Sequence, residues 1–334
     1  MNHALHRPPT RRTPLRKLTT AVLVVATAGS LALATSTAAQ AAYPGTDGKI
    51  TFVRSHQVYS VRSDGAGLRQ LTTANQNDHP KWSPDGARIA YVHHSTGGNS
   101  QVWVMHADGS HQQQVTGGHY ATEPSWSPDG QWLVYGRSAT VGDQDATLSK
   151  IRSTAPFGSP ITLLGHFEGE TDADNATTGV NGTVAWSPTG NDIYYYSHDF
   201  PSSPDNYILD LNLTTNVISE VDDIGGACCG EGFFGDLAVS ADGSTLGFTS
   251  LDYPEDATHP PTQPVIAMLA LHAGGGFTAA NTVRRDQQPA FAPAGDHVAL
   301  TNTRNGAKIY VTDTHLAHRR LLTTGSQPDW QPTH

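Results

Sequence analysis

The chain has 334 residues and a formal net charge of −10, from 30 acidic and 20 basic residues. Five of the basic residues and none of the acidic ones lie in positions 1–41, so the remainder carries 15 basic and 30 acidic residues and a formal charge of −15. Such an acidic surface repels phosphate backbones, and we therefore expect no nucleic-acid partner. The two cysteines are adjacent, which excludes a framework of several disulfides.

The N-terminus has the order of segments that is typical of a secretory signal peptide. A basic stretch at 7–17 precedes an apolar run at 21–34, and the small residues of 39–41 follow as a cleavage site. The apolar run is too short to span a bilayer, which needs ~20 residues. We predict that residues 1–41 are a signal peptide and that the product is secreted, extracellular or associated with the cell envelope. The adjacent arginines in the basic stretch leave the export route open between the twin-arginine and the ordinary route.

One motif recurs along the rest of the chain, as in Trp82-Ser83-Pro84-Asp85-Gly86. Its copies, increasingly divergent, lie at 80–91, 124–135, 184–190, 237–243 and 289–295. Each copy combines a short apolar strand, a tight turn with glycine and, in the fuller copies, an alternating strand. A second unit of two short strands follows, as at 101–116. One repeat thus contains four strands, A to D, at a period of roughly 40 residues, which is typical of propeller blades.

The two ends of the mature chain complement each other. It begins with a B strand at 47–52 and ends with an A strand at 328–330. Pairing of these strands would complete one blade and close a ring. We predict an all-β fold, a single six-bladed β-propeller over 42–334, closed by pairing of the N- and C-terminal strands, with no membrane span and a monomeric state.

The Trp-Ser-Pro-Asp-Gly repeats resemble those of the TolB-like (WD40-like, PD40) β-propeller family, over nearly all of the mature chain. The resemblance implies the six-bladed fold. TolB proteins carry an additional α/β domain before the propeller, for which this chain has no room, so the resemblance implies the fold and not the role of TolB. The repeat alignment also predicts that Trp82, Trp126, Trp186 and Trp330 are buried between neighbouring blades.

Connections in a propeller alternate between two faces. The A–B and C–D turns lie on one, which we call the short-turn face, and the B–C and D–A connections lie on the other, the long-loop face. The four longest connections, at 165–183, 197–206, 222–236 and 251–262, all belong to the second face. Because long loops on a rigid scaffold commonly carry binding, we expect the binding site there.

Six polar residues enter the innermost strands at the long-loop face and should surround the central channel: His79, Glu123, Thr183, Asp236, Gln288 and Gln327. We predict that His79, Glu123, Asp236, Gln288 and Gln327 bind the ligand. The alternative is that they only cap strands and hold channel water.

Two groups of residues have the chemistry of cation ligands. His79, Glu123 and Asp236 offer the imidazole and carboxylate groups that suit transition metals. The alternating acids Glu168, Glu170, Asp172 and Asp174 could surround a calcium ion, and a solvated acidic loop is the alternative. No cofactor is certain from the sequence; calcium or another divalent metal is the candidate. Free thiols do not persist outside the cell, so Cys228 and Cys229 could form a vicinal disulfide.

Two classes of function remain. The leading interpretation is a non-catalytic recognition or scaffold protein that binds an extracellular or cell-envelope protein or glycan on the long-loop face. The alternative is a metal-assisted polysaccharide lyase or hydrolase with its site in the channel, since related propeller lyases for acidic sugars use a histidine-rich metal site. The fold by itself does not choose between them.

Overall fold

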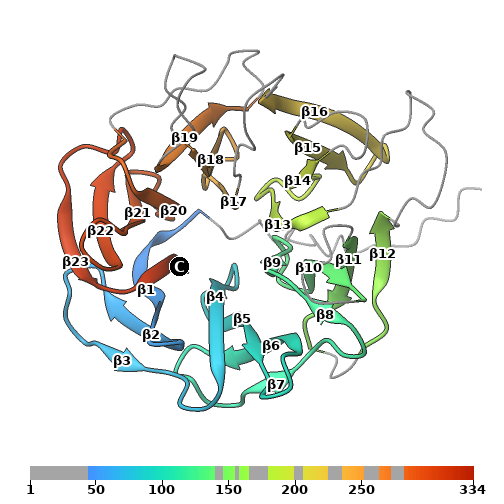
Figure 1. The fold of residues 1–334 in the computed structure, drawn as a ribbon, viewed down its shortest axis with the longest axis horizontal. Helices are drawn as coiled ribbons and strands as arrows, with labels where there is room; N and C mark the ends of the chain where they lie inside the picture. The colour runs from blue at the N-terminus through green and yellow to red at the C-terminus, as the bar shows by residue number, and fades with distance from the viewer. Residues whose placement is uncertain are drawn as a thin grey trace, which may run out of the picture. The chain divides into compact units, whose positions relative to one another are not determined.

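The computed structural model describes residues 44–139, 146–154, 158–164, 180–198, 206–224, 235–251, 263–271 and 282–334. Over these ranges the regular structure is β-strand, and it contains no helix long and apolar enough to cross a membrane. The strands form six antiparallel sheets placed around a common centre, with the C-terminus near that centre (Figure 1). The predicted six-bladed propeller is confirmed.

The terminal blade combines the two ends of the chain, as β24 (Ser326–Thr333), β1 (Thr46–Arg54), β2 (Gln57–Arg62) and β3 (Arg69–Gln70). The next blade contains β4 (Gln76–Trp82), β5 (Arg88–His94), β6 (Ser100–His106) and β7 (Gln113–Gln114). The third contains β8 (Tyr120–Ala121), β9 (Ser125–Trp126), β10 (Trp132–Ser138), β11 (Thr147–Arg152) and β12 (Ile161–Leu164). Its innermost strand is divided into β8 and β9, both of which pair with β10.

The fourth blade contains β13 (Val180–Trp186), β14 (Asp192–His198), β15 (Asn206–Asn212) and β16 (Val217–Ile224). The fifth has three strands among the described residues, β17 (Gly235–Val239), β18 (Thr245–Leu251) and β19 (Pro264–Ala270). The sixth contains β20 (Asp286–Phe291), β21 (His297–Asn302), β22 (Lys308–Asp313) and β23 (Arg320–Thr324).

Ring closure follows from the pairing of β1 with β24. Ile50 lies opposite Trp330, and Thr46 lies opposite Thr333. The apolar core leads to the same conclusion, because it divides into six clusters and each cluster bridges one pair of neighbouring blades. One of these joins β1 and β24 to the sixth blade, and another joins the terminal blade to the second. Closure is therefore a packing arrangement as well as a strand pairing.

The four tryptophans of the repeat are all buried, as the repeat alignment predicts. Trp126 is 1% exposed, and Trp82, Trp186 and Trp330 are at most 6% exposed. Each belongs to a different interblade cluster. A repeat tryptophan thus packs in four of the interblade clusters.

The Ser-Pro-Asp-Gly part of the repeat makes the A–B turns. In the second blade the Ser83 hydroxyl donates to Asp85 Oδ1 at 2.5 Å, and the same oxygen accepts the backbone N–H of Ala87 at 3.0 Å. Gly86 has φ +64°, and a Cβ there would lie 2.1 Å from the carbonyl oxygen of Pro332. Glycine is therefore required at this position both by the left-handed backbone and by the close approach of β24.

Several sequence predictions lie outside the described residues. These are the signal peptide at 1–41, the acidic stretch at 168–174, the cysteine pair at 228–229 and most of the four long connections. The strands flanking those connections are D and A strands, or B and C strands, as the alignment predicts. Three predicted connections are shorter than expected, because Thr183 lies within β13, His198 lies within β14 and Asp236 lies within β17.

Candidate functional site

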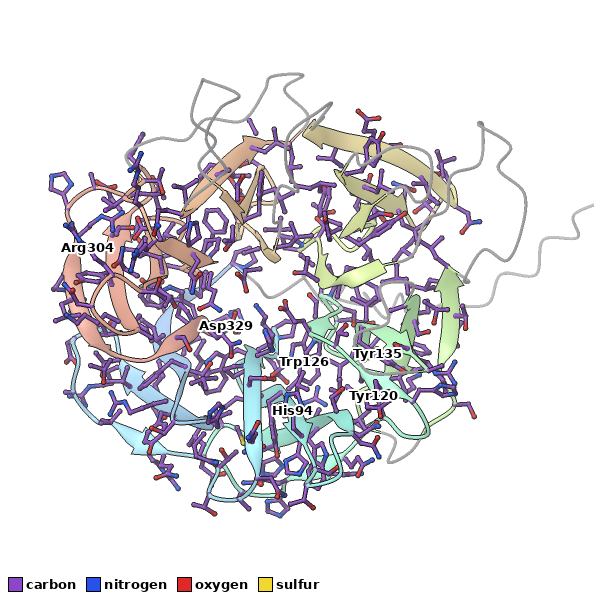
Figure 2. The ribbon with its side chains drawn as sticks, viewed as in Figure 1. His94, Tyr120, Trp126, Tyr135, Arg304 and Asp329 are labelled. Atoms are coloured by element: carbon purple, nitrogen blue, oxygen red, sulfur yellow. The ribbon has the colours of Figure 1, made fainter. Side chains whose placement is uncertain are left out.

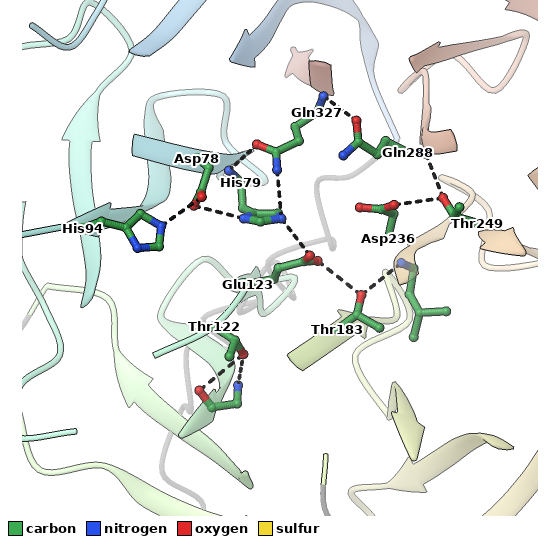
Figure 3. A network of polar contacts seen from close by, with 12 residues as sticks. Asp78, His79, His94, Thr122, Glu123, Thr183, Asp236, Thr249, Gln288 and Gln327 are labelled. Atoms are coloured by element: carbon green, nitrogen blue, oxygen red, sulfur yellow. Dashed lines mark hydrogen bonds and ion pairs between the residues drawn. The ribbon is translucent and has the colours of Figure 1, made fainter. Parts of the chain in front are cut away.

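The six polar residues predicted to surround the channel do come together, and Figure 3 shows them converging from the innermost strands. Four of them, His79, Asp236, Gln288 and Gln327, have positive φ values between 48° and 57°. The pairing register shifts at the same places, for example between Asp78 and Lys81 in β4. A left-handed residue in a bulge turns its side chain out of the strand's alternation, here toward the channel. We call this ring of six residues the channel mouth.

Hydrogen bonds link the channel-mouth residues from blade to blade. The backbone N–H of His79 donates to Gln327 Oε1 at 2.9 Å, and the backbone N–H of Gln327 donates to Gln288 Oε1 at 2.9 Å. The backbone N–H of Gln288 donates to Thr249 Oγ1 at 2.9 Å, and that hydroxyl donates to Asp236 Oδ2 at 2.8 Å.

The other half of the ring passes through Thr183 and Glu123. The Thr183 hydroxyl donates to Glu123 Oε2 at 3.2 Å and accepts the backbone N–H of Leu237 at 3.2 Å. Glu123 Oε1 lies 2.8 Å from Nε2 of His79, which closes the circuit (Figure 3). Every blade thus contributes to one continuous polar ring, whose contacts join each blade to its two neighbours.

His79 is the cationic centre of the ring. Its side chain is 24% exposed, with Nδ1 3.0 Å from Asp78 Oδ1 and Nε2 2.8 Å from Glu123. Burial lowers the pKa of His79, but the charges and hydrogen bonds of Glu123 and Asp78 outweigh it and hold that pKa well above its usual value. A neutral His79 could instead accept at Nε2 from Gln327 Nε2, which lies 3.0 Å away. The presence of a proton on Nε2 therefore decides whether this nitrogen bonds to Glu123 or to Gln327.

The two carboxyl groups of the channel mouth differ in pKa. Burial raises the pKa of Glu123, but the adjacent His79 cation lowers it below its usual value overall. Burial raises the pKa of Asp236 to about 6, and the negative charge of Glu123 contributes to the rise. Ligand atoms of His79, Glu123 and Asp236 all lie within 4.8 Å of one another, a spacing that a metal ion could bridge.

A second polar layer, which the sequence analysis did not identify, lies deeper in the channel. Lys81 and Asp329 occupy the positions two residues after His79 and Gln327 in their strands. Burial raises the pKa of Asp329 to about 6, against the lowering effect of Lys81 and of the bond from the backbone N–H of Trp82. Figure 2 shows Asp329 near the centre of the ring. The repeat alignment could have found this layer, because it gives Lys81 and Asp329 the same position, directly before Trp82 and Trp330.

The space at the channel mouth is small. A cavity of about 10 Å³ is lined there by His79, Lys81, Asp236, Gln288, Gln327 and the adjacent prolines. A cavity of about 80 Å³ follows deeper, between the repeat tryptophans, Lys81 and Asp329. Small-molecule sites usually enclose several hundred Å³. The described part of the channel therefore presents polar groups at an opening and does not form a pocket that would enclose a sugar or a peptide.

The pKa of Asp236 gives a testable pH dependence. Because the folded state raises this pKa from 3.8 to about 6, ionisation of Asp236 lowers the free energy of unfolding as the pH rises through that interval. Asp236→Asn keeps an acceptor for Thr249 and cannot ionise. We expect it to stabilise the protein by up to about 3 kcal/mol at pH 7.5, with the gain vanishing near pH 4.

Urea unfolding at the two pH values measures this difference. The matched control is Asp108→Asn on the short-turn face. The hydroxyl and backbone N–H of Ser110 lower the pKa of Asp108, so this variant should lose stability at neutral pH. A pH-independent effect of Asp236→Asn would contradict the electrostatic account of the ring.

Comparison with known proteins supports the architecture described above. Residues 34–168 match the PD40 family, the TolB beta propeller domain. The crystal structure of TolB from Acinetobacter baumannii superposes with a TM-score of 0.64 and 18% identity, over 86% of this chain and 67% of that one. The chain has a β-propeller similar in fold to that of TolB.

Other structures share this TolB-like propeller fold. A putative TolB from Agrobacterium tumefaciens matches with a TM-score of 0.54 and 17% identity, over 75% of this chain and 86% of that one. A chain of the nidogen/laminin complex matches with a TM-score of 0.60 and 8% identity, over 86% and 99% of the two chains. No curated protein matches this chain. At such identities the likeness concerns the fold alone.

Proposed function

We propose that this TolB-like propeller is a secreted, non-catalytic recognition protein that binds an extracellular or cell-envelope protein or glycan on its long-loop face, centred on the channel mouth. The supporting observation is the ring itself. Six blades place hydrogen-bonding side chains around one opening, and the backbone bulges fix their directions. Among the described residues the opening is too narrow to enclose a ligand, so binding would occur by surface contact with a larger partner.

The channel mouth offers both kinds of hydrogen-bonding group to a partner. Gln288 uses its Oε1 within the ring, and its amide Nε2 forms no hydrogen bond with a described residue. Asp236 receives the Thr249 hydroxyl at Oδ2, which leaves Oδ1 as a further acceptor. Both side chains are partly exposed. A site with fixed donors and acceptors can select a partner, because a mismatched partner leaves buried polar groups unpaired.

The test compares matched variants on the two faces. The channel-mouth variant is His79→Asn with Glu123→Gln, since asparagine tolerates a positive φ and glutamine has the size of glutamate. The control is His106→Asn with Asp108→Asn on the short-turn face. Immobilised protein would be exposed to the extracellular fraction, and captured protein and carbohydrate would be quantified beside the melting temperature. We expect the channel-mouth variant to lose about ten-fold or more of the capture and the control to lose little. Equal capture by both variants, measured at a temperature at which each is folded, would contradict the proposal.

The spacing of His79, Glu123 and Asp236 also favours a second candidate function, a metal-assisted polysaccharide lyase or hydrolase. These three residues would hold the metal, which would supply Lewis-acid chemistry when bound. Calcium or another divalent ion would have to displace the proton that His79 shares with Glu123, so binding should strengthen as the pH rises. Calorimetric titration with CaCl₂ and MnCl₂ at pH 6 and pH 8 distinguishes the candidates. No heat of binding at either pH would leave recognition as the proposed function.

A further inference from the structure

Basic residues are concentrated in two adjacent blades of this acidic protein. Ten of the 15 basic residues after position 41 lie in 44–72 and 282–334, the terminal and sixth blades, together with six acidic residues. The intervening residues 73–281 contain five basic and 24 acidic residues. Two neighbouring blades therefore carry a formal charge of +4, and the rest of the propeller carries −19.

Half of these ten residues belong to the long-loop face. They are Arg54 at the end of β1, Arg284 and Arg285 just before β20, Arg304 between β21 and β22, and Lys308 at the start of β22. These positions are where B strands end, C strands begin and A strands begin, which places them on the same face as the channel mouth. We call this set the basic patch. Figure 2 shows Arg304 at the outer edge of the sixth blade.

The structure connects the members of the basic patch through short contacts. Nε of Arg54 donates to the carbonyl oxygen of Thr324 at 2.9 Å, and Thr324 pairs with Lys308 across the β22–β23 ladder. Lys308 lies opposite Asn302. The Asn302 side chain accepts the backbone N–H of Arg304 at 3.0 Å and donates to the carbonyl oxygen of Arg284 at 3.3 Å. These contacts link four of the five patch residues across the two blades.

Three of the five charges of the basic patch are not neutralised within the described part of the chain. Asp286 is the acidic residue nearest in sequence, but it is fully buried and bonds to both terminal nitrogens of Arg319. Arg54, Arg304 and Lys308 form no ion pair with a described residue, and Arg304 is exposed. Arg54 is held in place by the rings of Phe52 and Tyr59, 5.2 and 5.4 Å from its guanidinium carbon. Such a fixed arginine suits the planar geometry of a carboxylate.

We propose that the basic patch is a docking site for an acidic polypeptide segment of a partner protein. Four arginines and one lysine complement closely spaced carboxylates. Val283, 40% exposed beside Arg284, adds an apolar contact of the kind a peptide side chain fills. A sugar ring packs its C–H face on an open aromatic ring, and the large apolar side chains exposed in the described chain are all aliphatic. This inference rests on the proposed function for the choice of face and adds the chemistry of the partner.

The experiment measures binding of a fluorescein-labelled oligoglutamate of about ten residues, which extends to ~33 Å, by fluorescence anisotropy at low and moderate NaCl. The patch variant is Arg304→Glu with Lys308→Glu. The control is Arg69→Glu, a charge reversal at an exposed residue on the short-turn end of β3. We expect the patch variant to weaken binding about ten-fold or more, the control to remain within about two-fold, and added salt to weaken binding to wild type.

Three outcomes would overturn the inference: no oligoglutamate binding by wild type, equal loss in patch and control variants, or equally tight binding of an oligogalacturonate with the same number of carboxylates. Equally tight oligogalacturonate binding would show that the patch binds any polymer of carboxylates and does not select a polypeptide. Sedimentation at low salt tests a further alternative, association of the patch with the acidic blades of a second copy. The channel-mouth variant is measured in parallel. If it keeps oligoglutamate binding while the patch variant loses it, the docking site stands even if recognition at the channel mouth fails.

Discussion

Deletion of residues 325–334 should prevent the propeller from closing, and we expect aggregation or a large fall in the melting temperature. The deletion removes β24, which is the innermost strand of the terminal blade and the hydrogen-bonding partner of β1. It removes Trp330 from the cluster between the terminal and sixth blades. It also removes Gln327, which bonds to His79 and Gln288 in the channel mouth. The exposed edge of β1 would then be free to pair with other molecules.

A circular permutant provides the control for this deletion. The hydroxyls of Thr46 and Thr333 lie 2.6 Å apart, so a short linker can join residue 334 to residue 44 in a variant that begins at position 44. New ends between Gly97 and Gly98 would open an exposed B–C turn and keep every strand. We expect the permutant to melt close to wild type and the deletion variant to melt far below it, in thermal scans followed by circular dichroism. Equal melting of the deletion variant and wild type would contradict closure by the terminal strands.

Trp126→Ala should cost ~3–5 kcal/mol, because it leaves a cavity between the second and third blades. The ring is 1% exposed, and the guanidinium of Arg88 lies over it at 4.7 Å. Its Nε1 donates to the carbonyl oxygen of Lys81 at 2.9 Å, so the substitution also leaves a buried acceptor unpaired. Domains are stable by only about 5–15 kcal/mol, so a large fraction of the stability would be lost.

Trp132→Ala is the matched control. Trp132 lies six residues further on, is only partly buried, and has Arg152 and Lys150 over its ring at 4.1 and 5.1 Å. Its loss should cost less than about 2 kcal/mol, since solvent can fill the vacated space. Guanidinium unfolding of both variants measures the difference. Similar costs for the two tryptophans would mean that the repeat position does not define the blade interface.

The sequence by itself determined the repeated unit and the closure of the ring. Each blade carries its own local signals: an apolar strand with tryptophan or a smaller apolar residue, a turn with glycine in the left-handed region, and an alternating strand. These signals lie within a few residues of one another, so they can be read without knowledge of the fold. Because all blades share one geometry, equivalent positions such as His79 and Glu123 could be assigned to the same ring.

Only the tertiary structure decided how those residues interact. His79 and Gln327 are 248 positions apart, and their contact depends on the bulges in two different blades. The opposite pKa shifts of Glu123 and Asp236 depend on their distances from His79 and from each other, which a repeat pattern does not contain. The same holds for the basic patch, where Arg54 of the terminal blade bonds to Thr324, the strand partner of Lys308 in the sixth blade. Local pattern specifies each blade, whereas charge and hydrogen bonding between blades act through space and appear only when the ring is assembled.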